Sequence, residues 1–183
     1  KDMGNKFKLI LMNFLQFAIW GAYLTSMGSY LFNIGLGEKI GLFYAMQGFV
    51  SLFMPAIIGI VADRWVPAQK LLGFCHLMGA IFMASAGYYG MSAGHSVEFG
   101  ILYSLYAGGV GFYMPTLALS NSVAYTALDR VKLDPVVAFP PIRIFGTIGF
   151  ICSMLMTDFL GFQASYMQFF SCACISLIAA GYV

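Results

Sequence analysis

Long stretches without a charged residue are the feature that most constrains how this chain can fold. Five such runs are present, and a sixth contains only one charge, Arg143. They cover residues 9–37, 40–62, 71–97, 99–128, 135–157 and 159–183. A helix that crosses a bilayer needs about 20 largely apolar residues. We therefore expect transmembrane helices over residues 9–33, 41–62, 71–92, 99–126, 139–157 and 162–183.

The composition excludes the common soluble classes. Hydrophobic residues make up 61% of the 183 residues and charged residues only 9%, whereas a soluble domain carries about 25% charged residues. So few charges cannot cover a water-facing globule, and they provide neither the basic face of a nucleic-acid binder nor the polarity of a disordered segment. Residues 52–58 lack the alternation that strands of a transmembrane barrel require. The chain is therefore expected to be an all-α polytopic membrane protein.

The positive charges predict an orientation, because Lys and Arg concentrate in cytoplasmic loops. With the N-terminus inside, the cytoplasmic side carries Lys1, Lys6, Lys8, Arg64, Lys70, Arg130 and Lys132. The outer side then carries Lys39 alone. We expect a multi-pass protein of the inner membrane with its N-terminus in the cytoplasm. The last run reaches Val183 without a flanking charge, so we also expect this chain to be half of something larger.

Neither a catalytic nor a metal site is expected. Cys172 and Cys174 are two residues apart, which places them about 200° apart around a helix, so one metal ion cannot easily bridge them. No acidic residue lies deep in an expected helix, and no Ser/His/Asp or paired-carboxylate set is available within the membrane. We therefore expect neither enzymatic activity nor a cofactor.

Arg143 is the most informative single residue. A charged side chain at membrane depth costs about 2.5–3.5 kcal/mol on insertion scales, so such residues are candidates for function. Thr147 and Phe150 follow four and seven residues later and share its helix face. That face offers a cation with five donors, a hydroxyl and an aromatic ring, which suits a small polar ligand with a flat ring. The alternative is that Arg143 extends back to the cytoplasm, and spacing alone does not separate the two.

Polar side chains also form stripes along three of the expected helices. They are Asn13, Gln16, Trp20 and Tyr23; Tyr44, Gln47 and Ser51; and Thr116, Ser120 and Asn121. Each stripe could line an aqueous cavity or join neighbouring helices through hydrogen bonds worth about 0.6 kcal/mol on average. Three stripes together with Arg143 favour a shared polar cavity, with Gln16 and Trp20 among its lining residues.

A short motif lies between the second and third expected helices. Gly59, Asp63 and Arg64 resemble the first half of a loop motif of the major facilitator superfamily, in which Gly is followed after three residues by Asp and a basic residue. The second half of that motif is replaced here by residues 65–68. The resemblance implies that these residues hold one conformation at a cytoplasmic seam through charge and helix-end contacts. The simpler alternative is ordinary anchoring of a loop.

Five further stretches sharpen the resemblance. They are FLQFAIWG at 14–21, GSY at 28–30, FMPA at 53–56, YMPTL at 113–117 and FPPIRIFGTIGF at 139–150. Together they are similar to the nucleoside:proton symporter family within that superfamily. The resemblance implies a twelve-helix fold in two six-helix halves, with substrate reached alternately from each side. This chain would be the N-terminal half, with the C-terminal half absent.

The resemblance also implies a function and a site. Members of the family import nucleosides together with protons, and Arg143, Thr147 and Phe150 match residues that line the nucleoside site. The acids suspected of coupling to protons belong to the second half. The expected partners are therefore a nucleoside, protons, the bilayer and the missing half, with no nucleic acid.

Other functions stay open on the residues alone. One is a transporter of another neutral polar metabolite, such as a sugar. Another is a non-transporting membrane scaffold subunit, in which the polar stripes only join helices. A channel is less well supported, because the sequence has no charged ring or repeated filter.

Overall fold

The computed structural model describes residues 2–24, 26–94, 96–161 and 166–182. The helices are α1 (Asp2–Gly21), α2 (Met27–Asn33), α3 (Ile40–Arg64), α4 (Ala68–Ala93), α5 (Phe99–Arg130), α6 (Pro135–Phe159) and α7 (Met167–Tyr182). A short 3-10 turn, η1 (Gly37–Lys39), precedes α3. No strand is found in these ranges, which confirms the all-α class.

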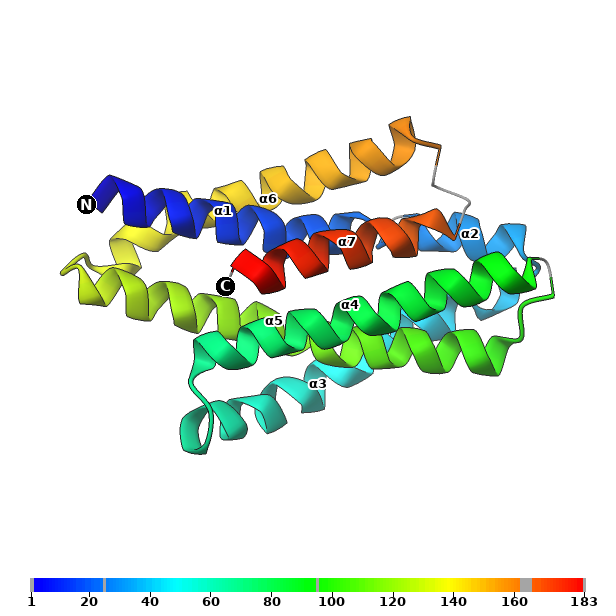
Figure 1. Ribbon diagram of the computed structural model, residues 1–183, viewed down its shortest axis with the longest axis horizontal. Coiled ribbons are helices and arrows are strands. Elements are labelled where there is room, and N and C mark those ends of the chain that lie inside the picture. The colour runs from blue at the N-terminus through cyan, green and yellow to red at the C-terminus, as the bar shows by residue number, and fades with distance from the viewer. Residues whose placement is uncertain (1, 25, 95, 162–165, 183) are drawn as a thin grey trace.

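The long helices lie side by side along the long axis of the molecule (Figure 1). Helix α1 packs against α6 and α7, α4 packs against α5 and α7, and α3 packs against α5. Helices α6 and α3 form the two edges of this view, with α1, α7, α4 and α5 between them. The structure therefore places α1 and α5 in the interior of the bundle, where each contacts several neighbours.

The first expected span is broken. One helix was expected over residues 9–33, but α1 ends at Gly21 and α2 begins at Met27. Backbone polar groups at membrane depth must find partners within the protein. Three carbonyls at the break accept hydrogen bonds from side chains of other helices. These bonds run from Thr157 Oγ1 to Ala22 O (3.3 Å), from Tyr44 Oη to Leu24 O and from Gln168 Nε2 to Ser26 O (3.3 Å).

The other helices differ from the expected spans mainly at their ends. Helix α6 begins four residues before the expected start at residue 139. Asp134 caps it by accepting a hydrogen bond from the Val136 amide at 3.1 Å, and Pro135 follows at the first helical position, where the lack of an amide proton costs nothing. The expected last span starts at residue 162, and residues 162–165 lie outside the described ranges.

Three of the described helical segments are long and apolar enough to cross a membrane by themselves. They are Gly37–Arg64, Ala68–Ala93 and Pro135–Phe159. Helices α1 and α5 carry several polar side chains that are at most 2% exposed: Asn13, Gln16, Thr116 and Ser120. These polar groups therefore point into the bundle.

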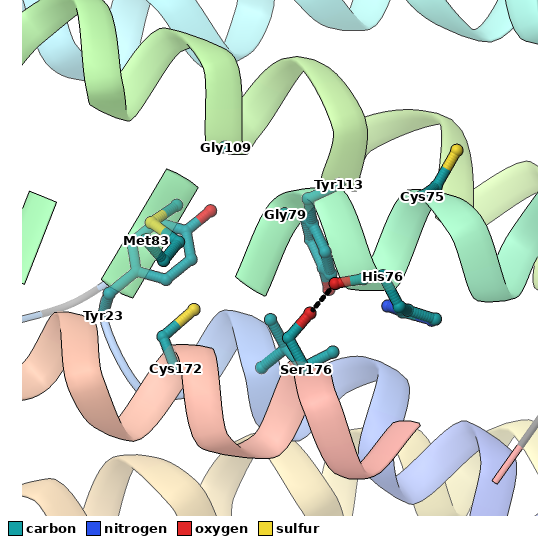
Figure 2. Close-up of a pocket in the computed structure, with 10 residues that line it drawn as sticks. Tyr23, Cys75, His76, Gly79, Met83, Gly109, Tyr113, Cys172 and Ser176 are labelled. Atoms are coloured by element: carbon teal, nitrogen blue, oxygen red, sulfur yellow. Dashed lines mark hydrogen bonds between the residues drawn. The ribbon is translucent and has the colours of Figure 1, made fainter. Parts of the chain in front are cut away.

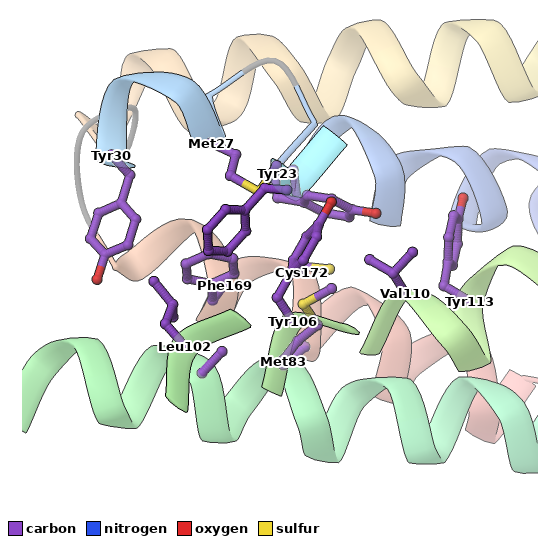
Figure 3. Packing of buried hydrophobic residues seen from close by; sticks show 14 of the residues in the cluster. Tyr23, Met27, Tyr30, Met83, Leu102, Tyr106, Val110, Tyr113, Phe169 and Cys172 are labelled. Carbon is purple, nitrogen blue, oxygen red and sulfur yellow. The ribbon is translucent and has the colours of Figure 1, made fainter. Parts of the chain in front are cut away.

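The larger apolar core surrounds the break in the first span (Figure 3). Tyr23 and Tyr106 are fully buried and meet edge to face, with ring centroids 6.2 Å apart. Tyr30 meets Phe169 of α7 in the same way at 5.5 Å. Such perpendicular ring pairs are favourable beyond the area that they bury. The break is therefore a densely packed part of the fold, which fixes where α1 ends.

Candidate functional site

Two glycines bring α1 and α6 into backbone contact. Gly149 lies against the carbonyl of Phe14, and Gly21 lies against the carbonyl of Phe150, so that neither position has room for a side chain. Small residues at helix interfaces allow this close approach in membranes. As a result, the helix face that carries Arg143 lies beside α1.

The Arg143 guanidinium is held from two sides. Its Cζ atom lies 3.9 Å from the centroid of the Phe17 ring of α1, which is a cation–π contact. Its Nη1 atom donates to Thr147 Oγ1 at 3.3 Å. Thr147 is one turn further along α6, so the guanidinium points away from the start of the helix. The guanidinium therefore lies beside α1 on a partly exposed face of α6, rather than at the start of the helix.

Four rings beside Arg143 form a cluster that we call the aromatic wall: Phe17, Trp20, Tyr113 and Phe150. Trp20 is at its centre. Its ring centroid lies 6.4 Å from that of Phe17, 6.3 Å from that of Tyr113 and 6.1 Å from that of Phe150. The Phe150 ring is nearly perpendicular to the indole, at 85°. The indole nitrogen donates to Gln47 Oε1 of α3 at 3.0 Å. One guanidinium, one hydroxyl and several rings are thus brought together by α1, α3, α5 and α6.

Gln16 takes a different position from the other candidates. It is 1% exposed, and its Nε2 atom donates to Thr116 Oγ1 of α5 at 2.7 Å. Its own backbone carbonyl accepts a hydrogen bond from Tyr113 Oη, also at 2.7 Å. Gln16 therefore joins α1 to α5 through these two hydrogen bonds and supports the aromatic wall at Tyr113.

Phe17 and Tyr113 belong to this cluster and were not among the residues selected from the sequence. Phe17 precedes Trp20 by three residues, so the two share a helix face, and this spacing was the available signal. The polar stripes are not all interior. Ser51 and Asn121 are exposed, and Ser51 Oγ donates to the Gly48 carbonyl of its own helix.

The loop-motif residues lie at the end of α3. Gly59 is within the helix, and Asp63 and Arg64 form its last turn with exposed side chains. A cation at this position interacts favourably with the negative end of the helix dipole. The motif is therefore a surface feature, separate from the aromatic wall.

A small internal cavity lies between α1, α4, α5 and α7 (Figure 2). Its volume is about 10 Å³, and Tyr23, His76, Cys172 and Ser176 are among its lining residues. Ser176 Oγ donates to the His76 carbonyl at 2.6 Å. A cavity of this size holds about one water molecule, so it is too small for a metabolite. Among the described residues, no three His, Cys, Asp or Glu side chains are placed to bind a metal ion.

The fold is that of an all-helical protein with helices long and apolar enough to cross a membrane, and its similarity to known proteins gives its family. Residues 3–183 match the family described as nucleoside H+ symporter. The chain belongs to the nucleoside H+ symporter family. This confirms the resemblance seen in the sequence.

Named relatives agree with the family. The chain is 41% identical over 181 residues to the nucleoside permease NupG of Escherichia coli (strain K12), covering 96% of this chain and 41% of that protein. It is 36% identical over 184 residues to the xanthosine permease of the same organism, covering 98% of this chain and 42% of that one. These relatives are transporters and not enzymes.

A solved structure confirms the fold. The crystal structure of the nucleoside transporter NupG matches with a TM-score of 0.87 at 38% identity, covering 97% of this chain and 43% of that chain. The fold is therefore that of part of a major facilitator transporter. The chain spans about two fifths of the length of the relatives that it matches.

Proposed function

We propose that the protein to which this chain belongs imports nucleosides together with protons by alternating access. The observation that carries this proposal is the contact of Arg143 with Phe17, which connects Arg143 and Thr147 to the rings of Trp20 and Phe150, in a chain of the nucleoside H+ symporter family. The names of two relatives, a nucleoside permease and a xanthosine permease, support the same class of substrate.

The chemistry of a nucleoside fits this face. A nucleoside is neutral, with ribose hydroxyls and a flat aromatic base. Arg143 has five donors, of which the structure places one nitrogen on Thr147, and the others are available to ribose or carbonyl oxygens. The Phe17 ring fixes the plane of the guanidinium. Phe150 and Trp20 then pack against the base, in the offset or edge-to-face arrangements that rings prefer.

The remaining candidates act at a distance from the substrate. Gln16 contributes by its hydrogen bonds to Tyr113, which is one ring of the wall, and to Thr116 of the same helix. Gly59, Asp63 and Arg64 stabilise one conformation at the cytoplasmic seam. The substrate binds between this bundle and a second six-helix half, a proposal that the greater length of the relatives supports. The excess of Lys and Arg on one side supports an inner-membrane protein with a cytoplasmic N-terminus.

The test is uptake of labelled uridine by cells that express the full-length protein, with and without a protonophore. Arg143→Ala is measured beside wild type at matched membrane abundance, and Arg130→Ala, an exposed cation at the end of α5, is the matched control. We expect uptake to collapse with the protonophore and with Arg143→Ala, and to persist with Arg130→Ala.

Each other outcome overturns a stated part of the proposal. If the well-folded protein shows no uptake, nucleosides are excluded as its substrate. That result would favour another neutral metabolite, such as a sugar, or a scaffold role. If uptake is unchanged by the protonophore, transport is not coupled to protons. If uptake is unchanged by Arg143→Ala, Arg143 is not part of the substrate-binding site.

A further inference from the structure

Gln47 makes a hydrogen bond between the side chains of two helices at the edge of the site. It lies on α3, is 7% exposed, and accepts a hydrogen bond from the Trp20 indole of α1 at 3.0 Å. An indole has a single polar atom, which can only donate. Gln47 Oε1 therefore accepts the one hydrogen bond that the Trp20 side chain can make.

The position of Trp20 in its helix makes this bond important. Trp20 is the penultimate residue of α1, and Ala22, Tyr23 and Leu24 after it form a turn. Tyr44, three residues before Gln47 and on the same face of α3, donates to the Leu24 carbonyl in that turn. Helix α3 thus fixes the end of α1 at two points, one on the backbone and one on the Trp20 ring.

The orientation of the Trp20 ring matters because other rings depend on it. Trp20 contacts Phe150 at 85° and Tyr113 at 50°. If the indole rotates, the ring surface that Trp20 and Phe150 present together changes shape. A ring surface of this kind distinguishes flat ligands by size, because a purine has two fused rings and a pyrimidine has one.

We propose that Gln47 is a positioning residue that sets nucleobase selectivity by fixing the orientation of Trp20. The inference rests on the proposed function, because it assumes that Trp20 and Phe150 receive the base. Gln47 itself acts through the indole and needs no contact with substrate. A glutamine that only joined α3 to α1 would affect folding and abundance equally for every substrate.

The experiment compares uptake of uridine and adenosine by the full-length protein carrying Gln47→Met. Methionine has nearly the shape of glutamine but does not replace its amide as a strong acceptor. We expect KM to rise about tenfold, as for loss of one buried hydrogen bond. The ratio of transport efficiency for uridine and adenosine should change at least about threefold, while the maximal rate at matched abundance stays near wild type.

Tyr103→Phe is the control. It removes a different hydrogen bond to α3, from Tyr103 Oη to the Leu42 carbonyl, and should leave the ratio unchanged.

A second comparison keeps the inference testable if Gln47→Met alone folds poorly. Trp20→Phe combined with Gln47→Met removes donor and acceptor together, which leaves no unsatisfied polar group. We expect this double variant to have the same selectivity as Trp20→Phe alone, because Gln47 acts only through the indole. An additional shift from Gln47→Met in the Trp20→Phe background would overturn the inference.

Two results would overturn the inference without touching the proposed function. One is a Gln47→Met protein with the KM and selectivity of wild type, in cells where Arg143→Ala abolishes uptake. The other is a Gln47→Met protein that only loses abundance. Failure of the proposed function has a different signature, which is absence of nucleoside uptake by the wild-type protein itself.

Discussion

Gly149 of α6 lies directly against the backbone carbonyl of Phe14 of α1. About two helical turns further along α1, Gly21 meets the carbonyl of Phe150 in the reciprocal arrangement. The two contacts fix both the separation and the rotation of the helices. They explain why Phe17 and Trp20, which lie between Phe14 and Gly21, face the Arg143 side of α6.

Replacing Gly149 with alanine should destabilise the protein. A methyl group there would collide with backbone atoms of Phe14, which cannot rotate away as a side chain can. We expect a loss of about 1–3 kcal/mol, as in other overpacked interfaces. The measurement is the unfolding temperature of the purified full-length protein in detergent. Gly48→Ala is the control, because no atom lies within 4 Å of the added methyl group. An unchanged unfolding temperature for Gly149→Ala would mean that the helices are further apart.

Substituting Arg143 with lysine should weaken uptake although the charge is kept. Lysine lacks the planar group that stacks on Phe17 and reaches Thr147. We expect KM for uridine to rise roughly tenfold, comparable with loss of one charge-assisted hydrogen bond. Concentration-dependent uptake measures this, with Arg130→Lys as the matched control. A wild-type KM for Arg143→Lys would show that charge alone is required.

The side-chain hydrogen bonds to backbone carbonyls at the break between α1 and α2 should contribute to the free energy of unfolding. Thr157→Val keeps the side-chain shape but removes the hydroxyl, whose one proton is shared between the Ala22 carbonyl at 3.3 Å and the Ser153 carbonyl of α6 at 3.0 Å. Hydrogen bonds between helices in membranes contribute about 0.6 kcal/mol on average, and an unsatisfied buried carbonyl costs about 1–3 kcal/mol. We expect a loss of about 1 kcal/mol in a denaturation series. Ser104→Ala is the control and should have no effect, because the Ser104 hydroxyl donates to the Gly100 carbonyl within its own helix. If the Thr157→Val and Ser104→Ala proteins have equal free energies of unfolding, the hydrogen bond from Thr157 to the Ala22 carbonyl does not stabilise the fold.

The sequence predicts features that depend on a single helix. Arg143 and Thr147 are four residues apart, so their contact follows from helix periodicity. The contact between Arg143 and Phe17 does not, because periodicity does not say which helices are neighbours. The same limit applies to Gln16, whose side-chain amide and backbone carbonyl both bond hydroxyl groups of α5.

The break after Gly21 illustrates a second limit. The run over residues 9–37 has no charge and no proline, so nothing within it predicts an interruption. What stabilises the break comes from distant residues, since Tyr44, Thr157 and Gln168 supply the donors. The early start of α6 is different, because Asp134 followed by Pro135 is a local signal that can be read from the sequence.

The proposed orientation in the membrane can be tested with two single cysteines in a background without native cysteines. Ser96 lies between α4 and α5, and Asp129 lies at the other end of α5; both are exposed. Neither substitution removes a Lys or Arg, so the charge bias that sets the orientation is kept. With a cytoplasmic N-terminus, Ser96→Cys should react with an impermeant maleimide in right-side-out vesicles, and Asp129→Cys should react only in inside-out vesicles. The reverse pattern would place the N-terminus outside and would leave the distribution of Lys and Arg without an explanation.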